Sequence, residues 1–302
     1  MQRNDSCRRG TLLGVVVFVM AMLGQFQSPY AFATDLGEQL DFADSLYVRK
    51  MYDMAAHEYE SYIAAADNAP ETETAYFRLG ESRYNLKQYD KTAAALTTLI
   101  KKFPNGDHAM QARLRLGEVL YRLGKYDDAA KYLEVVTKTG QLDTLKVAAL
   151  YYLGQSRLAA GEIDKSVAAF KRLINDYPRH GLVPYARFAL ATAYFEAKGF
   201  KNAAEQFTSM AETATLPSSL RAEATFKAGL AHTENKEYEK GTALFDQTIR
   251  EHPESPFAER AAYERAWATF YAGKIADADK LAKEFLEKHP TSKQCAGAKY
   301  LH

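Results

Sequence analysis

Small residues recur along this chain with a period of about 37 residues. Large apolar or aromatic residues mostly follow after nine, sixteen and nineteen positions, and another small residue follows after twelve. The seven small residues, here called anchors, are Ala43, Gly80, Gly117, Gly154, Ala191, Gly229 and Ala266. Their spacing is 37 residues, except for 38 between Ala191 and Gly229. Spacings of three, four and seven lie on one helical face, so the pattern predicts stacked copies of one α-helical unit.

Each unit is expected to contain two helices. Gly124 and Gly161 lie in short turns between them, because glycine adopts the left-handed conformation that ends a helix. A proline stops the second helix, since proline cannot continue the hydrogen-bond ladder. These prolines are Pro104, Pro178, Pro253 and Pro290. We expect each anchor to face the small residue twelve positions later, so that the two helices approach closely.

The third unit resembles the tetratricopeptide repeat. The residues that carry the resemblance are Leu116, Gly117, Tyr121, Gly124, Tyr126 and Ala129, with the unit-ending prolines at the motif's last position. The resemblance covers about residues 37–290 and implies a right-handed α-solenoid of about seven helix pairs plus a C-terminal capping helix. One departure is the position three residues after the anchor, where polar or small residues replace the usual large one. They are Arg83, Arg157, His232 and Thr269.

A narrower resemblance concerns the connectors between units. His252–Ala258 and His289–Ser292 each combine a histidine, a proline and a short polar stretch before an expected helix. This pattern is similar to repeats of bacterial envelope proteins, such as the outer-membrane assembly lipoprotein and the Tol–Pal-associated cell-division coordinator.

The N-terminus has the pattern of a secretory signal peptide. Three arginines precede an apolar run from Thr11 to Gly24, and Ala31–Ala33 is a small-x-small cleavage site. We expect residues 1–33 to be removed after Ala33 and the protein to reach the periplasm; an uncleaved anchor is the alternative. No cysteine closely follows the apolar run, so no lipid anchor is expected. Removal of Cys7 leaves Cys295 alone, which predicts no internal disulfide.

The rest of the chain is expected to form the seven repeats over residues 34–291. Residues 292–302 are then either a capping helix or the start of an eighth repeat. In both cases we expect Tyr300 and Leu301 to pack on the seventh repeat, because an uncovered apolar helix face is unfavourable.

Composition adds exclusions rather than a function. The chain is 47% hydrophobic and 25% charged, and its acidic and basic residues alternate rather than forming blocks. Nucleic acid is therefore not an expected partner. No phosphate-binding loop, paired cysteines, two-histidine zinc motif or nucleophile elbow is present in the sequence. We expect no enzymatic activity, no cofactor and no metal site.

The best candidate for a binding site is the face shared by the first helices. It is formed by residues three before, one after and four after each anchor, which lie one turn apart. The resemblance implies a groove for partner segments, and the assigned residues are Phe77, Glu81, Tyr84, Leu114, Glu118, Tyr121, Tyr151, Phe188, Phe195, Phe226, Tyr263, Trp267 and Phe270. Alternatively, the aromatics three before and four after the anchors are mostly core; Trp267 is expected to be exposed.

The predicted groove changes character along the chain. Its N-terminal end carries the carboxylates of Asp44, Glu81 and Glu118, whereas Leu230 and Trp267 make its C-terminal end apolar. Such a surface favours a peptide with apolar anchor residues and a basic stretch.

The sequence therefore predicts a secreted, non-enzymatic scaffold that binds another envelope protein or peptide in envelope or outer-membrane assembly or cell division. One alternative is an accessory region of a cell-wall or polysaccharide-processing enzyme that continues beyond residue 302. A third interpretation is self-association through the C-terminal end near Tyr300.

Overall fold

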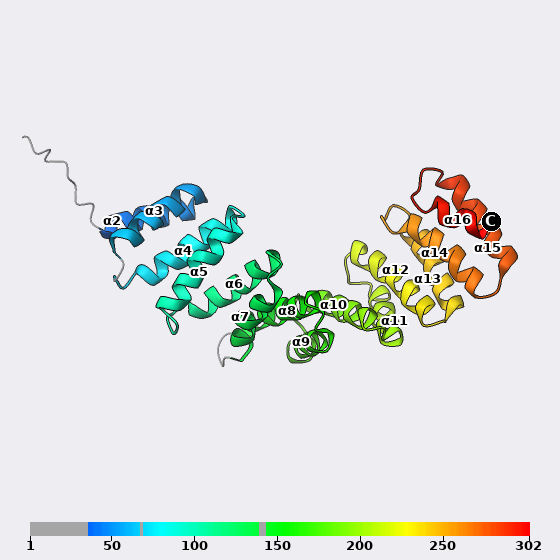
Figure 1. Cartoon of the computed structure of the whole chain (residues 1–302), viewed down its shortest axis with the longest axis horizontal. Helices are drawn as coiled ribbons and strands as arrows, with labels where there is room; N and C mark the ends of the chain where they lie inside the picture. Colours follow the sequence, from blue (N-terminus) through cyan, green and yellow to red (C-terminus); the bar gives the residue numbers. More distant parts are fainter. Residues whose placement is uncertain (1–35, 67–68, 139–142) are drawn as a thin grey trace, which may run out of the picture. The chain divides into compact units, whose positions relative to one another are not determined.

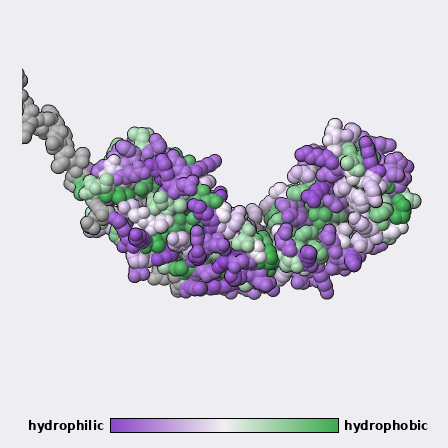
Figure 2. Space-filling model, in the orientation of Figure 1, coloured by the Kyte–Doolittle hydropathy of each residue, from purple (hydrophilic) through white to green (hydrophobic). Residues whose placement is uncertain are grey.

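The computed structural model describes residues 36–66, 69–138 and 143–302, so the expected signal peptide lies outside the described residues. The described residues form fifteen α-helices and no β-strand, which confirms the all-α prediction (Figure 1). The chain divides into two compact units, residues 1–82 and 83–302, which are described separately. Polar residues cover much of the visible surface, with hydrophobic patches between them (Figure 2).

The helices alternate as the period predicts. The first helices of the repeats are α2 (Leu36–Val48), α4 (Thr72–Asn85), α6 (Ala109–Arg122), α8 (Asp143–Ala159), α10 (Val183–Glu196), α12 (Ser218–Glu234) and α14 (Ala258–Tyr271). The second helices are α3 (Tyr52–Ala65), α5 (Tyr89–Lys102), α7 (Tyr126–Lys138), α9 (Ile163–Asp176), α11 (Phe200–Ala211), α13 (Tyr238–Glu251) and α15 (Ile275–Lys288). Every second helix begins nine residues after its anchor, and α16 (Cys295–Leu301) follows the last one.

The turn inside each helix pair has one left-handed residue, seven positions after the anchor. It is glycine in three repeats, at Gly124, Gly161 and Gly273. In the other four repeats it is lysine, with φ between 58° and 63°, at Lys50, Lys87, Lys198 and Lys236. The turns share one pair of hydrogen bonds; Gly124 N donates to Tyr121 O and Lys125 N to Leu120 O. This hydrogen-bond pattern, typical of a Schellman helix end, ends the first helix in every repeat.

The anchors are buried because each faces its partner helix. In the sixth repeat, the small residue twelve positions on, Gly241, lies against the anchor's carbonyl oxygen as expected. The sequence did not predict a second contact of the anchor, with the large residue sixteen positions later. A Cβ atom on Gly154 would lie 2.5 Å from the ring of Phe170, sixteen positions on, and Gly229 has the same relation to Phe245. The anchor is small because the large residue of the second helix occupies that space.

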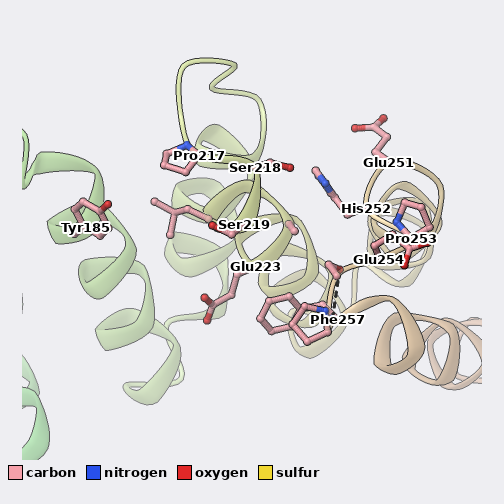
Figure 3. Close-up of a pocket in the computed structure, with 14 residues that line it drawn as sticks. Tyr185, Pro217, Ser218, Ser219, Glu223, Glu251, His252, Pro253, Glu254 and Phe257 are labelled. Carbon is pink, nitrogen blue, oxygen red and sulfur yellow. Dashed lines mark hydrogen bonds between the residues drawn. The ribbon is translucent and has the colours of Figure 1, made fainter.

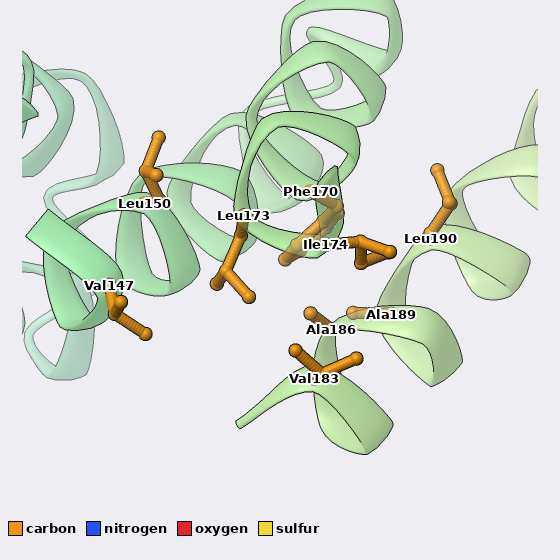
Figure 4. Close-up of a cluster of buried hydrophobic side chains, with 9 residues drawn as sticks. All are labelled: Val147, Leu150, Phe170, Leu173, Ile174, Val183, Ala186, Ala189 and Leu190. Atoms are coloured by element: carbon orange, nitrogen blue, oxygen red, sulfur yellow. The ribbon is translucent and has the colours of Figure 1, made fainter. Parts of the chain in front are cut away.

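Packing continues from each helix pair to the next within the second unit. One core cluster joins α8, α9 and α10 through residues such as Leu150, Phe170 and Leu190 (Figure 4). First helices also contact one another directly, in the pairs α6–α8, α8–α10, α12–α14 and α14–α16. Among the described residues, α10 and α12 make no contact of comparable extent. Their anchors are the two that are 38 residues apart.

Three of the four residues that depart from the repeat pattern, three positions after the anchor, form hydrogen-bonded pairs across the turn. Arg83 donates to Gln88 at 2.8 Å, and Arg157 pairs with Glu162. The His232 Nδ1 atom lies 2.6 Å from Glu237 Oε2. In these three repeats, a polar pair joins the residues three and eight positions after the anchor.

The last helix, α16, packs on the seventh repeat. Leu301 is buried against Ala266 and Ala282, whereas other repeats have a large residue at the position of Ala282. Leu301 therefore packs where the second helix supplies only a small side chain. Tyr300 stacks on Trp267 with ring centroids 6.2 Å apart but remains 81% exposed.

Candidate functional site

The thirteen residues of the predicted groove lie on first helices, and most are partly exposed. Phe77 and Glu81 belong to the first unit and the other eleven to the second, so only the latter are treated as one surface. Two of the thirteen, Glu118 and Phe226, are buried, with exposures of 6% and 2%. The Glu118 carboxylate is bound within the protein, which corrects its assignment to the groove, whereas the mostly buried Phe226 ring still borders a pocket.

Glu118 is enclosed by residues from three successive first helices. Its carboxylate accepts hydrogen bonds from Tyr84 Oη at 2.5 Å and from Tyr152 Oη at 3.0 Å. Arg115 and Arg122 donate to the same carboxylate at 2.7 and 2.9 Å. Two guanidinium groups therefore neutralise a charge that the sequence placed at the acidic end of the groove.

The protonation of this cluster follows from its contacts. Burial would raise the pKa of Glu118, but the hydrogen bonds from Tyr84 and Arg122 and the charge of Arg115 outweigh burial and lower it. Burial and the neighbouring carboxylate raise the pKa of Tyr152 to about 12. The cluster is thus a charged, hydrogen-bonded link between repeats two, three and four.

One open part of the first-helix face is a pocket of about 350 Å³ between α10 and α12. Thr192 and Phe195 line it from α10, and Phe226 and Leu230 line it from α12. The buried ring of Phe226 is covered by Phe257, from the connector before α14, at 5.5 Å between centroids. The pocket opens where neighbouring first helices make little direct contact, and we call it the α10–α12 pocket.

Charged side chains surround this pocket in pairs. Lys227 Nζ lies 3.7 Å from Glu223 and 5.1 Å from the centre of the Phe188 ring. Arg260 lies 3.5 Å from Glu264 and over the ring of Phe226. Sequence reasoning missed both cations, because the predicted face contains only the residues three before, one after and four after each anchor. Lys227 lies two residues before Gly229, and Arg260 lies six residues before Ala266.

A second feature of the face is an aromatic cluster around Trp267. The Trp267 ring contacts those of Tyr263, Phe270, Tyr271 and Tyr300 at centroid distances of 5.7–6.3 Å. Trp267 is only partly exposed, which corrects the expectation from the sequence, because Tyr300 of α16 stacks over it. Its indole nitrogen is buried and has no hydrogen-bond partner within the described part of the chain.

A larger hollow lies beside α12 on the side of the connectors. Its volume is about 640 Å³, and Tyr185, the Pro217–Glu223 segment and the Glu251–Phe257 connector line it (Figure 3). Phe257 and Glu223 also border the α10–α12 pocket, so the two hollows are neighbours. None of the predicted groove residues lines this hollow.

Over the described ranges, no group of three or more histidine, cysteine or acidic residues could hold a metal ion. Within the same ranges, no helix combines the length and apolarity that a membrane span requires.

Comparison with protein families supports the repeat assignment. Tetratricopeptide-repeat family models match residues 40–106, 83–143 and 148–180, and an outer membrane lipoprotein family matches residues 218–302. No curated protein matches the chain in sequence. Repeats of this type generally bind protein partners.

Solved structures show the same fold. The C-terminal part of a tetratricopeptide-repeat protein from Cytophaga hutchinsonii is 17% identical, with a TM-score of 0.66, over 86% of this chain and 98% of that one. A tetratricopeptide-repeat protein from Parabacteroides merdae is 16% identical, with a TM-score of 0.57, over 71% and 79% of the two chains. MamA from Desulfovibrio magneticus RS-1 is 21% identical, with a TM-score of 0.52, over 60% and 96%. The chain is therefore a tetratricopeptide-repeat protein that forms an α-solenoid, and its C-terminal part is similar to outer membrane lipoproteins.

Proposed function

We propose that this protein is a non-enzymatic scaffold of the bacterial envelope that binds a segment of another envelope protein. Residues 1–33 act as the signal peptide, residues 34–291 carry the repeats in the periplasm, and residues 292–302 cap them. The family match over residues 218–302 and the apolar N-terminal run support this location. The matched tetratricopeptide repeats support the scaffold role.

One observation carries the proposal: the α10–α12 pocket lies on the predicted face, and five of its ten lining residues are apolar. Phe195 and Leu230 are partly exposed there, above a floor that includes the buried rings of Phe207 and Phe226. A volume of about 350 Å³ is at the lower end of the range, about 300–1,000 Å³, that is typical of ligand pockets. An apolar side chain of a partner would gain free energy by leaving water for this pocket.

The test is recovery of partners from the native envelope with the tagged protein. We expect Leu230→Ala and Trp267→Ala to reduce recovery strongly, because truncation of an interface hot spot costs about 2 kcal/mol or more, roughly thirtyfold in affinity. Val135→Ser is the matched control, since Val135 is 42% exposed on the second helix α7. Circular dichroism checks that the variants are folded.

Equal recovery with Leu230→Ala, Trp267→Ala and the control would remove the first-helix face from the mechanism. The N-terminal sequence of the recovered protein tests the location, and we expect it to begin at Thr34. A recovered chain that begins at Met1 would contradict cleavage of the signal peptide.

A further inference from the structure

The cations beside the α10–α12 pocket are already committed to partners within the protein. Lys227 pairs with Glu223, and Arg260 pairs with Glu264, each four residues apart on its own helix. Both cations also lie over aromatic rings, an arrangement that holds their positive charge close to the pocket wall. An acidic group of a partner would have to displace Glu223 from Lys227, or Glu264 from Arg260, before it could bind either cation.

Two carboxylates near the pocket have no such partner. Glu196 ends α10 and Glu234 ends α12, each five residues after its anchor, and both side chains are exposed. Neither has an ion pair or hydrogen bond with another described residue. Each lies one helical turn beyond a residue of the pocket wall, Thr192 or Leu230, and Glu196 itself lines the pocket.

The pKa of the neighbouring Glu264 carboxyl group is raised, chiefly because the group is buried. Burial is the larger cause that raises the pKa of Glu264, and the charge of Glu234 raises it further, against the opposing charge of Arg260. Because Glu196 and Glu234 are exposed and unpaired among the described residues, the edge of the pocket at the C-terminal ends of α10 and α12 carries two free carboxylates. The dipoles of the two helices add to the negative potential there.

We propose that the α10–α12 pocket binds a partner segment in which a bulky apolar residue is adjacent to lysine or arginine. This proposal rests on the proposed function and names the chemistry of the partner at the same site. The apolar side chain enters between Phe195 and Leu230, and the adjacent basic groups lie against Glu196 and Glu234. Glu118 cannot contribute to the basic selectivity that the sequence predicted for the other end of the groove, because its charge is neutralised by Arg115 and Arg122.

The charged and the apolar contributions to affinity differ in how they depend on salt. Exposed ion pairs contribute modestly, so two of them should improve affinity by roughly tenfold at low salt. The effect should weaken at high salt, because the Debye length falls from about 10 Å at 0.1 M to about 3 Å at 1 M. Burial of the apolar side chain should persist at high salt.

The test uses the full chain and three labelled twelve-residue peptides, with binding measured by fluorescence anisotropy. One peptide has a single phenylalanine between lysines, the second has glutamates in place of the lysines, and the third has serine in place of phenylalanine. We expect the first to bind about tenfold more tightly than either of the others at 0.05 M salt. No measurable binding of the first peptide at millimolar concentration, or equal binding of the first two, would overturn the proposal.

Variants of the protein assign the selectivity to named residues. In the Glu196→Gln, Glu234→Gln double variant, the preference for lysine over glutamate should fall to less than about threefold. Glu205→Gln is the matched control, because Glu205 is exposed on the second helix α11. A preference unchanged in the double variant would also overturn the proposal. If Leu230→Ala still abolishes partner recovery from the envelope, the scaffold function stands and only the basic selectivity fails.

Discussion

Glu118 offers a direct test of whether a predicted groove residue has a structural role. Replacing it by leucine removes the acceptor shared by Tyr84, Tyr152 and the two arginines. Replacing Tyr152 by phenylalanine removes one donor and leaves the carboxylate with its other partners. Together the two changes form a double-mutant cycle around one hydrogen bond of 3.0 Å.

The magnitudes follow from burial and charge. A hydrogen bond to a charged group contributes about 1.5–3 kcal/mol, so Tyr152→Phe should lower the free energy of unfolding by about 1.5 kcal/mol. Breaking a buried ion pair costs about 3–5 kcal/mol. The Arg115 and Arg122 side chains are 30% and 41% exposed and can turn to water, so we expect about 3 kcal/mol for Glu118→Leu. In that background, Tyr152→Phe should add less than about 0.5 kcal/mol, because its hydroxyl has already lost the acceptor.

The assay is equilibrium urea unfolding at pH 7, with hydrogen exchange of α6 and α8 to locate the effect. Tyr126→Phe is the control, because the described residues include no hydrogen-bond partner for the Tyr126 hydroxyl; we expect a change below about 0.5 kcal/mol. Additive effects of Glu118→Leu and Tyr152→Phe would refute the reasoning. So would a stable Glu118→Leu variant that only lost partner binding.

Three further predictions concern stability. Lys236→Gly should raise the free energy of unfolding by up to about 1 kcal/mol. The substitution relieves about 1–2 kcal/mol of left-handed strain, which exceeds the cost of glycine's extra chain entropy in the unfolded state. A lower urea midpoint would contradict this prediction. Phe170→Ala should cost about 3–5 kcal/mol, because the ring is fully buried against Gly154, and a change below 1 kcal/mol would refute that packing role. The lowered pKa of Glu118 stabilises the fold above the ordinary glutamate pKa, and this contribution is lost as pH falls through the lowered value. The stability difference between wild type and Glu118→Leu should therefore shrink between pH 5 and pH 3, and a constant difference would count against it.

The sequence predicted the fold well because the period reports a geometric constraint. An anchor must be small wherever a large side chain of the partner helix fills the same space, as at Gly154 and Phe170. The start of each second helix followed from the same count. The left-handed turn position was legible only where it is glycine; at Lys198 and Lys236 the residue type gives no such signal.

The candidate site was harder to predict, because exposure depends on residues outside the repeat pattern. Phe188 and Phe226 occupy the same repeat position, yet Phe226 is buried because the connector residue Phe257 covers it. Glu118 accepts hydrogen bonds from Tyr84 and Tyr152, each 34 residues away in a neighbouring repeat. The pocket itself had one signal, the single spacing of 38 residues between Ala191 and Gly229.

The fit between anchor and large residue lies within one hairpin, and this has a consequence for how such a protein can change. The contacts between Gly154 and Phe170, and between Gly229 and Phe245, each lie within a single hairpin and involve no residue of a neighbouring repeat. Outward positions can then vary with little penalty to folding, as the shift from Glu81 to Leu230 at equivalent sites illustrates. Whole hairpins should accordingly be exchangeable as modules, carrying new recognition chemistry into the array while their internal fit is preserved.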